Sequence, residues 1–319
     1  MQKSFFTTLD YHPEIGCPLA DVYAAAIEHA CLADSLGYSG FWVAEHHFHN
    51  LGSLPNPAVF LASVAQCTGN IRLGPSISVL PWRTAIHTAE DYAMVDMLAS
   101  GRLNMGVGMG NTEAEFIRAG VDFDARRAVF EERLIELKSC WSSPYDTSMD
   151  TLNVRPVQAP IPRIYVSTNT PERAYRAGTE GDSVLSIVSP GAENLKGIEQ
   201  VVLAHARGLA ESKTDVTDAE VVVTAYACAA ETEEAAVEVA AVSIGRFMMA
   251  ATGQAMPDPQ AMCRQMTSRD AGLIGTKEQI SRQLSRYNDI GVKHVSFLGS
   301  FGCMTSEQVK SSIELLAAA

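Results

Sequence analysis

Short apolar segments alternate with longer segments of helical periodicity along most of the chain. In residues 18–37, for example, Val22, Ala26 and Ala30 recur with a spacing near four residues, as on one face of a helix. The short apolar segments are almost uninterrupted, which is typical of strands buried on both faces of a parallel sheet. Strands are predicted at 4–10, 38–45, 71–81, 102–110, 163–168, 182–188, 220–230 and 292–299. Helices are predicted at 18–37, 56–70, 85–101, 126–141, 171–181, 192–212, 232–251 and 305–319.

Strict alternation of strands and helices requires parallel strands, because each helix carries the chain back to the same end of the sheet. Eight such units in a chain of 319 residues predict a closed (β/α)8 TIM barrel. An open, doubly wound sheet is the alternative. It is disfavoured because no GxGxxG motif follows the first strand, and the nearest approach is "GVGMGN" at 106–111. We therefore expect one (β/α)8 barrel domain over residues 1–319.

Three segments are longer than a minimal barrel needs, so we expect them to be insertions. They lie at 111–125, 142–162 and 252–276. The third combines Gly, Pro, Gln and Met with weak periodicity, and a further predicted helix at 277–291 follows it. Irregular segments of this length in a compact domain are usually active-site lids or disordered insertions. We expect a mobile lid around 252–276, with a floppy insertion as the alternative.

The composition narrows the possible partners and the compartment. With 37 acidic and 24 basic residues the formal net charge is −13, and no Lys/Arg cluster is present to neutralise nucleic-acid phosphates. There is no uninterrupted apolar stretch of membrane-spanning length, and the first residues lack the apolar region of a signal peptide. The seven cysteines are scattered without a CxxC motif, which favours reduced thiols. We expect no nucleic-acid or membrane partner, and a cytoplasmic location.

The strongest candidate for chemistry is "GFWVAEHHFHN" at 40–50, because its polar part begins where the second barrel strand should end. Adjacent histidines on an extended strand point to opposite sides, so His46 and His47 would not easily share a metal ion. His47 and His49 would share one only if the strand continued, and no HExxH motif is present, so we predict no metal. General acid–base catalysis needs one histidine with an orienting neighbour such as Glu45. Histidines that merely cap the rim are the alternative.

Several stretches in order resemble the bacterial luciferase-like family of flavin-dependent monooxygenases. They are 40–48, 54–74, 78–111, 126–132, 164–174 and 272–297, and together they span nearly the whole chain. The resemblance implies a (β/α)8 barrel, in agreement with the strand count. It also implies that reduced FMN (FMNH2), supplied by a separate flavin reductase, reacts with O2 to a C4a-hydroperoxide. That species would oxidise a small organic substrate such as an aldehyde, alkane or ketone.

The resemblance also suggests roles for individual residues. It implies that His46 is the catalytic acid or base, that Glu45 and His47 support it, and that His49 is a bystander. It places a non-prolyl cis peptide of the third strand under the flavin, which here would join Ser76 to Ile77. Family members often dimerise through helices near the second and third strands. Residues 56–66 and 89–99 are apolar enough for such a contact, so we expect a homodimer.

The phosphate site departs from the family pattern. Met109, followed by Gly110, stands where luciferases have an arginine, and a methionine makes no charge-assisted bond to phosphate. Arg127 matches a second phosphate-binding arginine. The resemblance adds the loop after the fifth strand, where hydroxyls and helix N-terminal amides would contact phosphate through Thr168, Asn169 and Thr170. We expect a flavin site with fewer charges. An F420-dependent hydride-transfer enzyme and a catalytically silent flavin-binding partner subunit are the alternatives.

Overall fold

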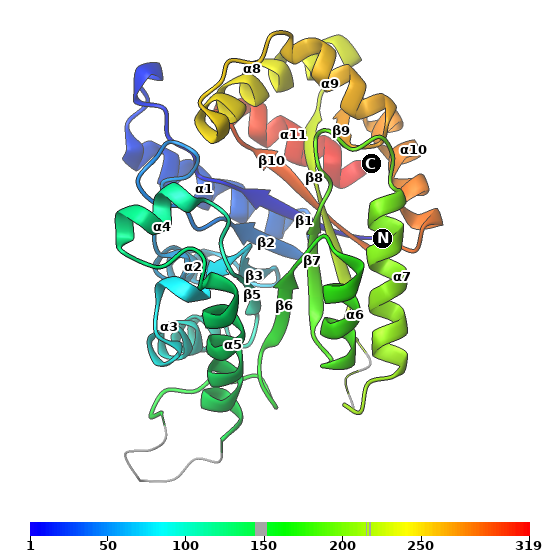
Figure 1. Cartoon of the computed structure of the whole chain (residues 1–319). Coiled ribbons are helices and arrows are strands. Elements are labelled where there is room, and N and C mark those ends of the chain that lie inside the picture. Colours follow the sequence, from blue (N-terminus) through cyan, green and yellow to red (C-terminus); the bar gives the residue numbers. More distant parts are fainter. Residues whose placement is uncertain (144–151, 215, 217) are drawn as a thin grey trace.

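The computed structural model of the protein describes residues 1–143, 152–214, 216 and 218–319 (Figure 1). Within these residues a ten-stranded parallel sheet has the order β3-β2-β1-β10-β8-β7-β6-β5-β4, and β9 pairs with β8 beside this path. The strands are β1 (Gln2–Thr7), β2 (Gly40–Val43), β3 (Arg72–Pro75), β4 (Ser78–Val79), β5 (Asn104–Gly108), β6 (Arg163–Ser167), β7 (Ser183–Ile187), β8 (Val221–Ala229), β9 (Gly272–Gly275) and β10 (His294–Ser300).

The third barrel strand is divided into two segments. β3 pairs with β2, β4 pairs with β5, and a parallel bridge joins Leu73 to Leu103 just before β5 begins. β3 and β4 therefore share one position between β2 and β5, and the sheet curls into a nearly closed barrel. With β9 outside that circle, the predicted (β/α)8 barrel is confirmed. The prediction of one continuous strand over 71–81 was wrong, because Ser76 and Ile77 interrupt the pairing and a 3-10 helix begins at Leu80.

Helices surround the strands, as the alternating pattern predicted (Figure 1). The helices that follow barrel strands are α1 (Leu19–Ser35), α2 (Pro57–Cys67), α3 (Ala85–Leu98), α5 (Arg126–Ser142), α6 (Pro171–Thr179), α7 (Lys196–Ala210), α8 (Glu233–Thr252) and α11 (Ser306–Ala318). Their first turns carry clear start signals. At α2, the Asn56 side chain accepts hydrogen bonds from two helix amides and Pro57 occupies the first helical position. At α11, Thr305 forms a capping box with Gln308.

Residues 252–276 differ most from the expectation of an irregular segment. They contain α9 (Pro259–Ser268) and β9, and α10 (Lys277–Asp289) follows directly. Asp258 caps α9 by accepting a hydrogen bond from the Ala261 amide, while Cys263 and Met266 are fully buried. The sequence hid this order because only two apolar side chains of α9 face the barrel, too few to give a strong period. A role as a lid stays a prediction.

The other two insertions also contribute to the structure. Residues 111–125 contain α4 (Glu113–Ala119), a short helix that continues from the end of β5. In the insertion predicted at 142–162, residues 144–151 lie outside the described residues. The described remainder includes Gln158, whose side-chain amide donates to Asp96 Oδ1 at 2.7 Å and to the Leu103 carbonyl at 2.8 Å. This second insertion is thus fastened beside the start of β5, whereas α4 lies at its end.

Among the described residues α8 is the one helix long and apolar enough to span a membrane. Of the apolar 18-residue stretch of α8 that meets this criterion, 39% is buried inside the protein. Ala236, Ala240 and Ile244 are fully buried on the side that packs toward β8 and β9. Because helices that cover a barrel meet the same criterion of length and composition, this single helix is weak evidence for a membrane span.

Candidate active site

The carboxyl ends of the barrel strands surround a cavity of about 730 Å³. This is the end at which TIM barrels carry their active sites, and the volume is typical of small-molecule sites. One wall is apolar and comes from β1, β8, β10 and α8. Its side chains are Phe6, Tyr226, Leu298, Phe247 and Met248. The opposite wall is polar and begins at the end of β2, where Glu45 and His46 line the cavity.

The chain leaves β2 two residues earlier than predicted, at Val43. Beyond it the backbone is no longer extended, and Phe48 adopts a left-handed conformation with φ of 68°. The His46 amide donates to the Leu54 carbonyl at 3.2 Å, which holds the returning loop against the strand end. The strand parity that predicted opposite directions for adjacent residues therefore does not apply here, and Glu45 and His46 both line the cavity.

Glu45, which is buried in the cavity wall, is paired with the half-buried His47. Glu45 Oε2 accepts a hydrogen bond from the Val79 amide at 3.1 Å, and its Oε1 lies 3.2 Å from His47 Nε2. The His47 ring stacks on Trp82, with 4.1 Å between centroids and 10° between planes. Glu45 thereby ties the end of β2 to β4. The supporting roles that the resemblance implied for both residues stay a prediction.

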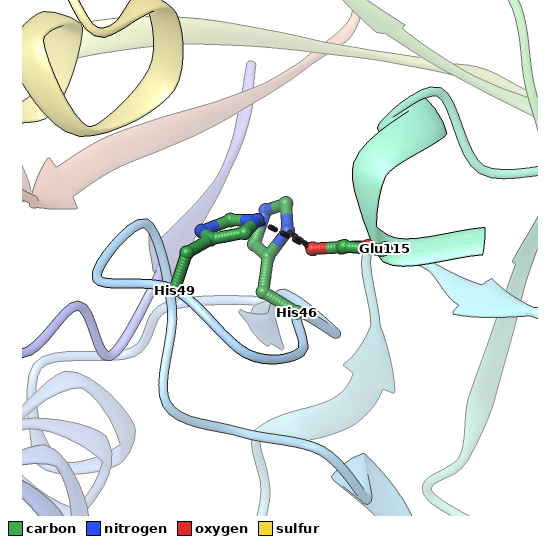
Figure 2. A group of neighbouring side chains, drawn as sticks. All are labelled: His46, His49 and Glu115. Atoms are coloured by element: carbon green, nitrogen blue, oxygen red, sulfur yellow. Dashed lines mark hydrogen bonds and ion pairs between the residues drawn. The ribbon is translucent and has the colours of Figure 1, made fainter. Parts of the chain in front are cut away.

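A second carboxylate, that of Glu115 in α4, contacts His46 and His49 (Figure 2). Its Oε1 lies 3.1 Å from His46 Nδ1 and 2.7 Å from His49 Nε2, and it accepts the His47 amide at 3.2 Å. Burial raises the pKa of Glu115, but the hydrogen bonds from His46 and the His47 amide outweigh this, so that the pKa lies below its usual range. His49, predicted to be a bystander, belongs to this cluster. Burial lowers the pKa of His49.

The floor of the cavity is formed by the interruption between β3 and β4 together with the end of β5. The peptide bond between Ser76 and Ile77 is cis, as the resemblance implied, and both residues line the cavity. Gly108 packs against Ile77 so closely that a Cβ atom at Gly108 would lie 2.2 Å from Ile77 Cδ1. Met109 and Gly110 continue the floor toward α5 and α6.

A second cavity of about 600 Å³ adjoins the first, because Met109 and Ser167 line both. Three arginines face it, namely Arg127 from α5 and Arg173 and Arg176 from α6. Arg176 is neutralised by Glu131 at 2.7 Å and Glu180 at 2.9 Å. In the described part of the chain Arg127 and Arg173 form no ion pair. The carboxylates of Asp124, Glu131, Glu172, Glu180 and Asp182 also line the cavity. An anion would therefore be held only beside Arg127 and Arg173, which pair with no carboxylate among the described residues.

Arg173 brings a guanidinium group close to Met109. Its Nη1 lies 3.8 Å from the Met109 sulfur, so a guanidinium group occupies the neighbourhood of the missing family arginine. Burial lowers the pKa of Arg173, and the nearby positive charge of Arg127 lowers it further. Arg173, on α6, was not singled out from the sequence, and the expected shortage of charge at the phosphate site stays a prediction.

A family model described as luciferase-like monooxygenase matches residues 3–294. The chain belongs to the luciferase-like monooxygenase family. Among its relatives, the oxygenase component of flavin-dependent trigonelline monooxygenase from Acinetobacter baylyi is 26% identical, over 92% of this chain and 87% of the relative. Two uncharacterised proteins of Sinorhizobium fredii are also similar. One is 34% identical over 59% of this chain and the other is 35% identical over 58%, and each match covers 56% of the relative. The chain thus matches little more than half the length of those two relatives.

Solved structures show the same fold at low sequence identity. Monooxygenase RslO1 from Streptomyces bottropensis has a TM-score of 0.88 at 21% identity, covering 99% of this chain and 98% of that one. The oxygenating constituent of 3,6-diketocamphane monooxygenase from Pseudomonas putida, in complex with FMN, has a TM-score of 0.79 at 17% identity, covering 99% and 97%. An F420-dependent secondary alcohol dehydrogenase, in complex with an F420-acetone adduct, has a TM-score of 0.73 at 18% identity, covering 99% of this chain and 98% of that one. Members of this fold thus bind either cofactor.

In this member of the luciferase-like monooxygenase family the loop after β6 differs from the residue-level expectation. The Asn169 side chain accepts hydrogen bonds from the Ser186 hydroxyl at 2.8 Å and the Ile187 amide at 2.9 Å, and Thr168 accepts one from the Thr170 amide at 3.1 Å. Among the described residues, these three side chains line neither cavity; Ser167 lines both. Their phosphate-binding role stays a prediction. In the structure the Asn169 side chain holds the loop to β7, and Thr168 and Thr170 bond to each other.

Proposed function

We propose that the protein is a flavin-dependent monooxygenase that uses reduced FMN and O2 to oxidise a small organic substrate. The observation that carries this proposal is the pairing of two adjoining cavities within a monooxygenase family. The larger cavity has His46 in its polar wall and faces it with an apolar wall. The smaller cavity is lined by Arg127 and Arg173, which form no ion pair among the described residues. A flat ring system in the first and a phosphate in the second would satisfy both.

The residues present fit FMN. The larger cavity has space for the ring system above Ile77 and Gly108, and Arg127 and Arg173 would hold the phosphate. Bound reduced flavin would supply the electrons for the reaction with O2. The chain's own contribution is to exclude water with the apolar wall and to keep the ring against the cavity floor. His46 would hold or move a proton at the rim, beside the reacting atoms.

The lining of the larger cavity also constrains the substrate. Among the described residues that line it there is no lysine or arginine, and the wall opposite His46 is built from aromatic and aliphatic side chains. A carboxylate or phosphate on the substrate would be buried there without a cation, which is costly. We propose a mainly apolar substrate without an anionic group, such as an aldehyde, alkane or ketone. The hydroxyl groups of Thr8 and Thr224 are available to bind a polar group on it.

The test of the proposal is an anaerobic titration with reduced FMN, followed by mixing with oxygenated buffer. We expect binding of reduced FMN and a rate of flavin reoxidation that differs from that of free flavin. In His46→Ala we expect binding to persist while substrate oxidation falls. The second candidate is F420-dependent hydride transfer, which the F420-dependent structural neighbour favours. Tight F420 binding with no binding of reduced FMN would contradict the FMN assignment.

The proposal includes partners and a compartment. The Acinetobacter baylyi relative is named as an oxygenase component, so we propose that a separate reductase supplies reduced flavin here. All seven cysteines are free, in keeping with a cytoplasmic, reducing location. We also propose a homodimer, because α2 and α3 expose large apolar side chains. Val59 is 70% exposed, Met94 52% and Met97 50%. Light scattering should find a dimer, and Met97→Asp should give a monomer.

A further inference from the structure

The protonation pattern of the cluster around Glu115 can be worked out from its hydrogen bonds. The Leu51 amide donates a hydrogen bond to His49 Nδ1 at 3.1 Å, so this nitrogen carries no proton. In the neutral ring the proton then resides on Nε2, which lies 2.7 Å from Glu115 Oε1. This contact is short but is not aligned as a hydrogen bond. The N–H group therefore lies beside the carboxylate without donating a hydrogen bond to it, and the positive charge of a protonated His49 would lower the pKa of Glu115.

His46 takes the opposite tautomer. Its Nδ1 forms a hydrogen bond of 3.1 Å with the same oxygen of Glu115. An ionised carboxylate only accepts hydrogen bonds, so Nδ1 must be the donor and carry the proton. Neutral His46 then has a free lone pair on Nε2. A buried carboxylate that fixes the tautomer of a catalytic imidazole in this way is a general device in enzymes.

The His46 ring is also confined on its other side. A Cβ atom at Gly52 would lie 2.9 Å from His46 Cβ and Cδ2 and from the Thr8 carbonyl oxygen. The imidazole is therefore packed between the backbone at Gly52 and the carboxylate of α4. Rotation of the ring would break the bond between Nδ1 and Glu115.

We propose that Glu115 is a positioning residue that holds His46 in its Nδ1–H tautomer, with the Nε2 lone pair available as a proton acceptor, and that His49 supports this carboxylate. The assigned use of that lone pair rests on the proposed monooxygenase function, whereas the tautomer rests on the cluster geometry alone. The role falls to α4, which belongs to an insertion and not to the minimal barrel.

A divalent metal ion is the competing occupant of the same cluster. The ligand atoms of His46, His49 and Glu115 lie within 4.8 Å of one another, and zinc commonly takes two histidines and one carboxylate. Zinc needs a lone pair from each ring, however. The Leu51 amide occupies the lone pair of His49 at Nδ1, so that the proton sits on the nitrogen nearest Glu115. The hydrogen bonds therefore favour the proton-holding cluster over the metal site.

The direct test is nitrogen NMR of the full-length protein labelled with ¹⁵N-histidine, recorded above the titration range of histidine. His46→Gln and His49→Gln assign the signals by their loss. We expect His46 to show a protonated Nδ1 and an unprotonated Nε2, and His49 the reverse. Glu115→Ala should shift His46 toward the Nε2–H tautomer. Glu115→Gln retains an acceptor oxygen and should largely keep the Nδ1–H form. Glu113→Gln, on the same helix, should leave the His46 signals unchanged.

The outcomes separate this inference from the proposed function. A wild-type His46 in the Nε2–H form would overturn the tautomer assignment even if Glu115→Ala failed to fold. An unchanged His46 tautomer in folded Glu115→Ala would overturn the role of Glu115. Stoichiometric Zn²⁺ binding by calorimetry that is lost in His49→Gln would establish the metal site instead. If the tautomers are as expected but reduced FMN neither binds nor reoxidises, the positioning geometry stands and the monooxygenase assignment fails.

Discussion

Replacement of Arg173 by methionine is the sharpest test of the proposed phosphate site. Methionine keeps an unbranched apolar stem but removes the guanidinium that faces the second cavity. A hydrogen bond to a charged group contributes about 1.5–3 kcal/mol. Since each 1.4 kcal/mol is a factor of ten, the Kd for reduced FMN should rise by about 10- to 150-fold in Arg173→Met. Anaerobic fluorescence or calorimetric titration measures this change directly.

Two controls make the result specific to phosphate. Reduced riboflavin has the same ring system without the phosphate, so its affinity should be unaffected by Arg173→Met. Arg176→Met removes an arginine of the same helix that is already paired with Glu131 and Glu180. This variant should lose only about 0–1 kcal/mol of binding free energy for reduced FMN. Met109→Arg in the Arg173→Met background should recover FMN affinity, because it returns a guanidinium to the end of β5. Equal losses for reduced FMN and riboflavin would refute the phosphate assignment.

Two further predictions concern His46 and the stability of the barrel. Gly52→Ala should displace the His46 ring and lower substrate turnover by roughly 100-fold with an unchanged circular dichroism spectrum; full turnover would show that the ring position is not critical. Burial lowers the pKa of His29 in the folded protein to about 4. As the pH falls below about 6.5, His29 is therefore protonated in the unfolded state while it is still neutral in the folded state. The free energy of unfolding should therefore drop by about 3 kcal/mol more in the wild type than in His29→Gln between pH 6.5 and 4, as urea titrations can measure.

Much of the fold was predictable because it depends on local pattern. Apolar runs such as 220–230 identified buried strands, and the count of alternating units identified the barrel. The interruption at Ser76 and Ile77 was missed, because an apolar run looks the same whether its residues pair with both neighbouring strands or with one. The same limitation applies to β9 at Gly272–Gly275, which is too short to be distinguished from a loop.

The site was predictable where it depends on strand ends and not where it depends on distant partners. The polar residues after β2 marked the rim, so His46 was found. Glu115 was missed because its role arises from a contact across 69 positions of the chain, which a single sequence does not reveal. Its segment offered only a carboxylate on a short helix, a pattern that is far more often a solvated surface.

Met109 also shows that the neighbours of a residue in space cannot be read from its position in the sequence. Compared position by position with the family, the chain lacks a charge at the end of β5. In space the charge is present, because Arg173 in the first turn of α6 reaches within 3.8 Å of the methionine sulfur. A phosphate is held by cations at suitable points around it, and the field of a guanidinium does not depend on the element that carries it. The position of a charge, more than its place in the sequence, therefore determines whether this site holds FMN, and the Met109→Arg rescue of Arg173→Met tests that equivalence.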